Sequence, residues 1–114
     1  MKKYQLSGRQ YTCSLQLALS AIMGKWKGII VWILLFDVKV IRYGELRRMI
    51  NTVESVTDRM LIQALKELEG DGLIERKVYA VVPPKVEYKL TKAGTRVKPI
   101  IVALEQFGEA YLTK

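Results

Sequence analysis

The stretch TDRMLIQALKELEGDGLIERKVYAVVPPKVEYKL, residues 57–90, decides the fold because its hydrophobic period changes partway along it. In its first part, four apolar residues recur at the i, i+3, i+4, i+7 spacing of one helix face: Leu61, Ala64, Leu65 and Leu68. Thr57 is a favourable N-cap, and the glycines of the segment 70–72 are typical of a helix end. We therefore predict a long helix over residues 57–69 with its leucine stripe turned inward.

The second part of this stretch has the character of strands. Residues 73–79 and 86–90 are rich in branched and aromatic side chains, and the tip between them holds Pro83, Pro84 and Lys85. Prolines are acceptable in such a tip because its amides are not needed by a strand ladder. A β-hairpin is therefore predicted directly after the long helix.

Upstream of residue 57 the pattern is mostly helical. Residues 14–23 carry a helical stripe, and residues 26–36 are apolar all round, which fits either a central helix or a buried strand. A length of about three turns favours the helix. This half is completed by an extended piece at 38–42, a short helix at 43–50 and a polar turn at 51–55. Of the aromatic residues in the whole chain, we expect Trp26, Trp32 and Tyr88 in the core.

Downstream, Thr91 is expected to cap a last helix over residues 91–111. Its apolar stripe has five positions: Val97, Ile100, Ile101, Leu104 and Tyr111. The helices at 14–23 and 91–111 together have more apolar surface than one small core can cover, which favours a homodimer; the alternative is that the last helix packs on its own domain. Without a linker or repeat, residues 1–114 are expected to form one domain.

The order of these elements predicts a fold of the α+β class, mostly α. Two helices across a short turn followed by a β-hairpin make a winged helix-turn-helix, here with extra terminal helices that form the dimer. In that arrangement the second helix enters the major groove of DNA and the hairpin, or wing, reaches the backbone or minor groove.

The outer face of the helix at 57–69 is the candidate DNA-reading surface. It starts at Thr57 and carries four side chains at helical spacing: Arg59, Ile62, Gln63 and Lys66. Arginine can pair with guanine, glutamine with adenine, and isoleucine can contact a thymine methyl, whereas Lys66 is better placed for phosphate. The alternative is that this face is merely the solvated side of an amphipathic helix.

The charge balance supports a polyanionic partner. The 114 residues contain 19 Lys and Arg against 11 Asp and Glu, a formal net charge of +8, which favours nucleic acid first and an anionic membrane surface second. Backbone contacts are expected from Arg47, Arg48, Lys77 and Lys85. Lys25 and Lys27 open the central helix and could either contact phosphate or serve as solubilising charge.

The absence of histidine excludes several kinds of site. Without histidine the chain cannot build a Ser-His-Asp or Cys-His relay or a His-based zinc site, and one cysteine cannot close an internal disulfide. We therefore expect no enzyme activity, no cofactor and no metal. The basic N-terminus has no apolar run behind it, and the most apolar stretch, residues 29–36, is too short to span a membrane, so we expect a cytoplasmic protein with no membrane partner.

Several segments, in order, resemble the HxlR-type (MarR-like) winged helix-turn-helix transcriptional regulators. They are residues 24–27 (GKWK), 43–48 (YGELRR), 65–74 (LKELEGDGLI), 82–88 (VPPKVEY) and 90–94 (LTKAG). The resemblance runs from residue 13 to about 108, and it implies a homodimeric bacterial or archaeal DNA-binding regulator with a recognition helix at 57–69 and a wing at 77–85. The turn at 51–55 is longer than usual for the family, and Ile62 replaces a residue that is often small and hydroxylated.

The single cysteine, Cys13, precedes the first predicted helix. Amide donors and the helix dipole at such a position favour a reactive thiolate, and the resemblance implies a possible redox sensor there, although Ser14 stands where the family often has proline. The alternative is a small buried apolar residue.

These observations predict a sequence-specific dimeric transcriptional regulator, a repressor rather than an activator, bound to a palindromic operator in double-stranded DNA. Any small-molecule effector is left open. The alternatives are a winged-helix protein-interaction module and a non-specific architectural DNA-binding protein.

Overall fold

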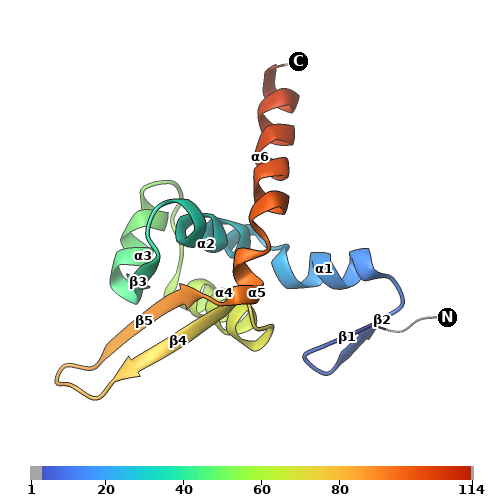
Figure 1. The fold of residues 1–114 in the computed structure, drawn as a ribbon. Coiled ribbons are helices and arrows are strands. Elements are labelled where there is room, and N and C mark those ends of the chain that lie inside the picture. Colours follow the sequence, from blue (N-terminus) through green and yellow to red (C-terminus); the bar gives the residue numbers. More distant parts are fainter. Residues whose placement is uncertain (1–3, 114) are drawn as a thin grey trace.

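The computed structural model describes residues 4–113 (Figure 1). Its elements, in chain order, are β1 Tyr4–Leu6, β2 Arg9–Tyr11, α1 Ser14–Ile22, α2 Lys25–Phe36, β3 Val40–Arg42, α3 Tyr43–Asn51, α4 Asp58–Gly70, β4 Ile74–Tyr79, β5 Lys85–Leu90, α5 Lys92–Thr95 and α6 Lys98–Thr113. The expected fold class, a mostly helical α+β winged helix-turn-helix, is confirmed.

The core is built around α2. This helix is apolar on every side, and Ile30, Val31, Ile33 and Leu34 are all buried, so the helical alternative for residues 26–36 is correct. The stripes of α3 and α4 pack on the same cluster, with Leu46, Leu61 and Leu68 fully covered. The helix-turn-helix therefore shares one core with the central helix.

A three-stranded antiparallel sheet lies beside these helices. Its strand order is β3-β5-β4, with Ile41 opposite Tyr88 and Ile74 opposite Leu90. Gly72 has a φ of +78°, a conformation that glycine adopts without strain, and it turns the chain from α4 into β4. The hairpin of β4 and β5 extends away from the body of the molecule as the wing (Figure 1).

The last predicted helix is in fact two helices, which corrects the expectation for residues 91–111. Thr91 does cap a helix, since its hydroxyl accepts from the Gly94 amide, but α5 ends at Thr95 and α6 begins at Lys98. In one continuous helix the ring of Pro99 would clash with the carbonyl of Thr95 and a hydrogen bond would be lost. Gly94 also packs tightly, because a Cβ there would lie 2.0 Å from the Leu73 carbonyl oxygen.

A short N-terminal hairpin, β1 and β2, was not predicted. Its turn is formed by Ser7 and Gly8, which have positive φ values of 50° and 78°. The Ser7 hydroxyl donates to the Asp71 carboxylate at 2.6 Å, and Arg9 pairs with the same carboxylate at 3.3 Å. The hairpin is thus attached to the end of α4.

Crossing a membrane requires a helix that is both long and apolar. Within residues 4–113 no single helix is both long and apolar enough; α1 and α2 together pass by length and composition, but they are bent by 77° relative to each other.

Candidate nucleic-acid interface

The turn between α3 and α4 is held by side chains of its own. The Asn51 side-chain oxygen accepts from the Val56 amide at 3.0 Å, and Val56 is buried. Thr57 is the N-cap of α4, and its hydroxyl accepts from the Met60 amide at 3.1 Å. The predicted polar turn and the predicted cap therefore fix where α4 begins.

Asp58, in the first turn of α4, joins the two helices of the motif. Its carboxylate accepts a short hydrogen bond from the Tyr43 hydroxyl and lies 3.2 Å from Arg47 Nε. Burial, with help from the bond to Asp58, raises the pKa of Tyr43 to about 12, so this hydroxyl stays protonated. Arg47 is thereby partly neutralised, whereas Arg48 is exposed and forms no ion pair with another described residue.

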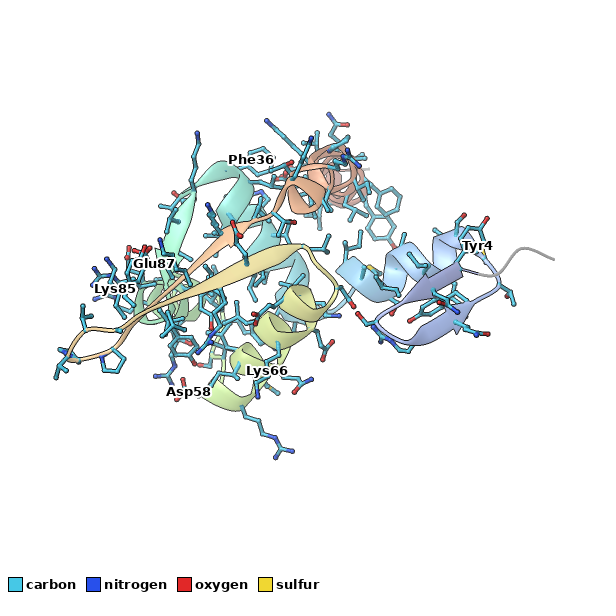
Figure 2. All side chains as sticks on the ribbon, turned by 60° about the horizontal axis from the view of Figure 1, so that its bottom comes forward. Tyr4, Phe36, Asp58, Lys66, Lys85 and Glu87 are labelled. Atoms are coloured by element: carbon cyan, nitrogen blue, oxygen red, sulfur yellow. The ribbon has the colours of Figure 1, made fainter. Side chains whose placement is uncertain are left out.

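The outer face of α4 carries the side chains that the sequence singled out. Arg59, Ile62, Gln63 and Lys66 are exposed on the side of the helix opposite the buried leucines. In Figure 2, Asp58 marks the start of α4 and Lys66 lies further along the same helix. Arg59 and Lys66 form no ion pair within residues 4–113, so their charges are available to a polyanion.

Gln63 differs from its neighbours because it has a fixed partner. Its Nε2 donates to Glu67 Oε2 at 2.9 Å, one helical turn further on. The pKa of Glu67 is held below its usual value, first by a hydrogen bond from Lys27 and next by this bond from Gln63. A carboxylate that stays ionised therefore lies beside the exposed outer face of α4.

The wing carries its two predicted lysines around one aromatic ring. The ammonium groups of Lys77 and Lys85 lie 4.8 Å and 4.5 Å from the centre of the Tyr79 ring. The Tyr79 hydroxyl donates to Glu87 Oε1 at 2.7 Å, which lowers the pKa of Glu87, and Lys85 lies 3.3 Å from the same carboxylate. The outer half of the wing, next to its loop, is thus basic and ordered by contacts, while Val82 in the loop is fully exposed.

A hollow of about 470 Å³ separates α4 from the wing. Ile62 and Lys66 line it from α4, Arg76 and Val86 line it from the sheet, and Tyr43 and Tyr88 are also among its walls. Arg76 was not among the predicted contacts. The position of Arg76 could have been found from the alternation of side chains along β4, which places every second residue on one face of the strand.

Cys13 is exposed and is the N-cap residue of α1. Its side chain makes no capping hydrogen bond, and the first turn of α1 holds no acidic residue. The expected position before the first helix is therefore observed, and the buried alternative is wrong. Within residues 4–113 no cluster of three or more His, Cys, Asp or Glu side chains is arranged to hold a metal ion.

The terminal helices expose large apolar side chains. The exposed residues are Leu15 and Leu19 of α1, Met23 just after it, and Ile100, Leu104, Phe107, Tyr111 and Leu112 of α6. The rings of Phe107 and Tyr111 stack at 5.9 Å. Of the stripe predicted for the last helix, Val97 and Ile101 are buried and the other members are exposed.

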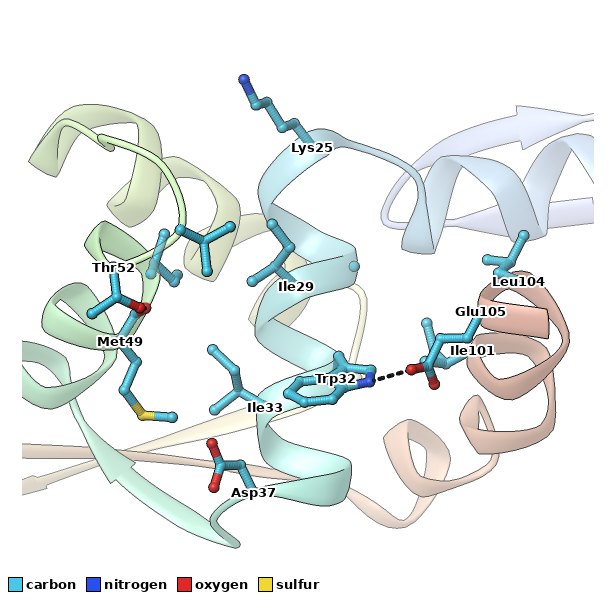
Figure 3. A pocket seen from close by; sticks show the side chains of 13 residues that line it. Lys25, Ile29, Trp32, Ile33, Asp37, Met49, Thr52, Ile101, Leu104 and Glu105 are labelled. Carbon is cyan, nitrogen blue, oxygen red and sulfur yellow. Dashed lines mark hydrogen bonds between the residues drawn. The ribbon is translucent and has the colours of Figure 1, made fainter. Parts of the chain in front are cut away.

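A second hollow, of about 690 Å³, lies between α2, the end of α3 and α6 (Figure 3). Trp32 stands in its middle with 38% of its surface exposed, so the expectation that this residue belongs to the core was wrong. Its indole N–H donates to Glu105 Oε2 at 2.9 Å, a bond that joins α2 to α6. The walls are otherwise mostly apolar, with Ile29, Met49 and Leu104 among them.

These features define the winged helix-turn-helix class. They are a capped helix with an exposed polar face, an ordered turn before it and a basic hairpin after it. The chain belongs to the HxlR-like helix-turn-helix family, which matches residues 21–114. The resemblance predicted from the sequence is confirmed, and with it the function class of a DNA-binding transcriptional regulator.

Individual relatives agree with this assignment. The chain is 43% identical over 103 residues to the uncharacterized HTH-type transcriptional regulator YkvN of Bacillus subtilis, covering 90% of this chain and 83% of that protein. The solved structure of the redox regulator HypR in its oxidized form is 43% identical, with a TM-score of 0.75, and covers 86% of this chain and 96% of the other. That of the putative HTH-type transcriptional regulator ytcD is 37% identical, with a TM-score of 0.80, over 90% and 100% of the two chains.

Proposed function

We propose that this protein is a dimeric, sequence-specific repressor that acts by binding a palindromic operator in the cytoplasm and not by catalysis. The observation that carries the proposal is the outer face of α4, where Arg59, Gln63 and Lys66 are exposed and follow a fixed turn and cap. The net charge of +8 supplies long-range attraction to DNA.

The face of α4 would read bases from the major groove. Arg59 and Gln63 offer the donor and acceptor patterns that suit guanine and adenine, and Ile62 offers an apolar contact to a thymine methyl. Thr57, at the start of the helix, and Lys66, further along it, would contact the sugar–phosphate backbone.

The remaining predicted contacts would fix the register on the duplex. Arg48 is free to meet phosphate, and Arg47 can do so while it remains beside Asp58. Lys77 and Lys85 are held near one another by the Tyr79 ring, so the wing would present two ammonium groups, that of Lys85 paired with Glu87, to the backbone or minor groove. Arg76 in the hollow between α4 and the wing is a further candidate for this role.

We also propose that residues 1–114 form one domain and that a second copy covers the exposed faces of the terminal helices at 14–23 and 91–111. Exposed apolar patches of this kind mark interfaces, and a two-fold pair would present its two α4 helices to successive major grooves about 34 Å apart. Leu104 belongs both to this face and to the wall of the pocket at Trp32, so the partner would lie at the edge of that pocket.

Cys13 is the proposed point of redox modulation. It is exposed at the N-terminus of α1, on a helix that we assign to the dimer interface, and the similar structure of HypR is that of a redox regulator. A peroxide would convert its thiolate to a sulfenic acid, which could condense with a second thiol to a disulfide and release water.

The test is a binding titration against the DNA upstream of the protein's own gene and against a shuffled duplex of the same composition, at two salt concentrations. We expect preference for the natural duplex and a steep loss of affinity with salt, about a thousandfold between 50 and 200 mM. Equal binding to both would indicate a non-specific architectural protein, and no binding at low salt a protein-interaction module. An oxidant effect that is absent in Cys13→Ser would support the redox role.

A further inference from the structure

A buried lysine lies behind the proposed DNA-reading face. Lys27 of α2 is only 6% exposed, although the sequence suggested either a phosphate contact or solubilising charge for it. Its Nζ lies 2.8 Å from Glu67 Oε1 of α4 and donates to the Ser20 carbonyl of α1 at 3.2 Å. Three helices therefore meet at one ammonium group, which cannot reach DNA from this position.

Glu67 extends this contact to the reading face. One of its carboxylate oxygens faces Lys27, and the other accepts from Gln63 Nε2 at 2.9 Å. A carboxylate only accepts, so the amide nitrogen of Gln63 must be the atom that faces it. Because both oxygens are engaged, the carboxylate cannot rotate without losing a contact, and the Gln63 amide is held in one orientation.

We propose that Lys27 and Glu67 are positioning residues that set the base preference of the protein by fixing the Gln63 amide. This inference rests on the function proposed above. A fixed amide presents its carbonyl oxygen and its remaining N–H as an ordered acceptor and donor, which is the pair that recognises adenine. A free amide can flip and present the reverse pattern, and it must lose side-chain freedom when it binds.

Lys25 provides a matched control on the same helix. Its ammonium is paired with Glu54, and 57% of its side chain is exposed. Replacing either lysine by methionine removes one positive charge and keeps an unbranched side chain that is one atom shorter. The difference between Lys27→Met and Lys25→Met therefore reports the buried contacts of Lys27, to Glu67 and to the Ser20 carbonyl.

The first experiment measures base preference. Wild-type protein selects a duplex from a randomised pool, and each base pair of that duplex is then substituted in turn. Gln63→Ala identifies the positions that Gln63 reads. Lys27→Met should lose about tenfold in preference at those positions and keep the other preferences, whereas Lys25→Met should weaken all duplexes alike. Lys27→Arg, which retains the charge, should recover part of the preference.

Two further variants complete this test. In a Gln63→Ala background, Lys27→Met should change base preference no further, because the amide it positions is gone. Glu67→Gln retains a polar group beside Lys27 and should lose part of the same base preference. It serves as the test if Lys27→Met folds poorly. The inference is overturned if Lys27→Met and Glu67→Gln keep wild-type preference, or if they lose preference equally at every base pair.

A second measurement needs no DNA and separates this inference from the proposed function. The side-chain amide signals of Gln63 in the free protein are identified by their loss in Gln63→Ala, and their mobility is measured by NMR relaxation. We expect a restricted amide in wild type and Lys25→Met and a mobile one in Lys27→Met. If wild type prefers no duplex but its Gln63 amide is restricted, the proposed function is wrong and the positioning of Gln63 by Lys27 and Glu67 still stands. If the amide is equally mobile in all three proteins, the positioning is wrong.

Discussion

Helices α4 and α6 have the same kind of sequence and very different surroundings. Both carry apolar residues at helical spacing, and in α4 all four members of the stripe are buried. In α6 only the base of the helix is covered, and the rest stands away from the body of the molecule (Figure 1), with Phe107 67% exposed. Helical periodicity shows that a face is apolar, and it does not show which chain covers that face.

The difference divides the energetics of the protein into two parts. Contacts of α4 stabilise the fold of one chain, because water is already excluded from its stripe. Contacts of the exposed part of α6 can contribute only when a second surface covers it, since its apolar side chains meet solvent. Substitutions in the two helices should therefore change different measured quantities.

The largest effect is expected in the stripe of α4. Leu61 is fully buried, so Leu61→Ala should lower the free energy of unfolding by about 2–5 kcal/mol through lost burial and the cavity left behind. Urea denaturation measures it. Leu112→Ala in α6 is the matched control, because this leucine is 82% exposed in the single chain. At concentrations where both proteins are monomeric, its loss should change stability by no more than about 0.5 kcal/mol. Equal losses would contradict the division between the two helices.

The next effect concerns the exposed face of α6. Phe107→Asp should leave the fold intact and weaken dimerisation at least about a hundredfold, or about 2.7 kcal/mol, because it places a charge where the Phe107 and Tyr111 rings stack. Sedimentation equilibrium measures the dissociation constant. Gln106→Asp adds the same charge at an exposed polar position next to it and should have little effect. A Phe107→Asp protein that dimerises like wild type would place the interface elsewhere.

A smaller effect is expected at the start of α4. Thr57→Ala removes the hydroxyl that accepts from the Met60 amide and should cost about 1 kcal/mol in the free energy of unfolding. Thr57→Ser keeps that hydroxyl and should retain most of the stability. Thermal and urea unfolding of the three proteins check this, and an alanine variant as stable as wild type would show that the cap contributes nothing.

Helices α4 and α6 also differ in how well the sequence predicted their bounds. The elements with strong periods or capping residues, such as α4 after Thr57 and the hairpin around Pro83, were predicted close to their observed bounds. The break before α6 was missed because the apolar stripe continues across Pro99, and backbone geometry outweighs the stripe there.

Other features depended on contacts distant in sequence. The hairpin at β1 and β2 is too short for its alternation to stand out, although Ser7 and Gly8 were a turn signal. The exposure of the outer face of α4 was predictable, because outer positions follow from the inner stripe. The burial of Lys27 could not be predicted from the sequence. A lysine near a helix start has the same local sequence whether it faces solvent or a carboxylate on another helix.

The smallest expected effect is a pH dependence that arises from the contact between Lys27 and Glu67. The pKa of Glu67 is lowered in the folded protein, so its contribution to stability is complete above the pKa of the unfolded chain, about 4.3, and is lost as the pH falls through the lower folded value. Because 42% of the Glu67 side chain is exposed, this contribution should be no more than about 1 kcal/mol. Urea unfolding of wild type and Glu67→Gln between pH 7 and pH 3 measures it. The stability difference between the two proteins should shrink as the pH falls below about 5, and a difference that does not change with pH would mean that the ionised carboxylate contributes nothing to holding α4 against α2.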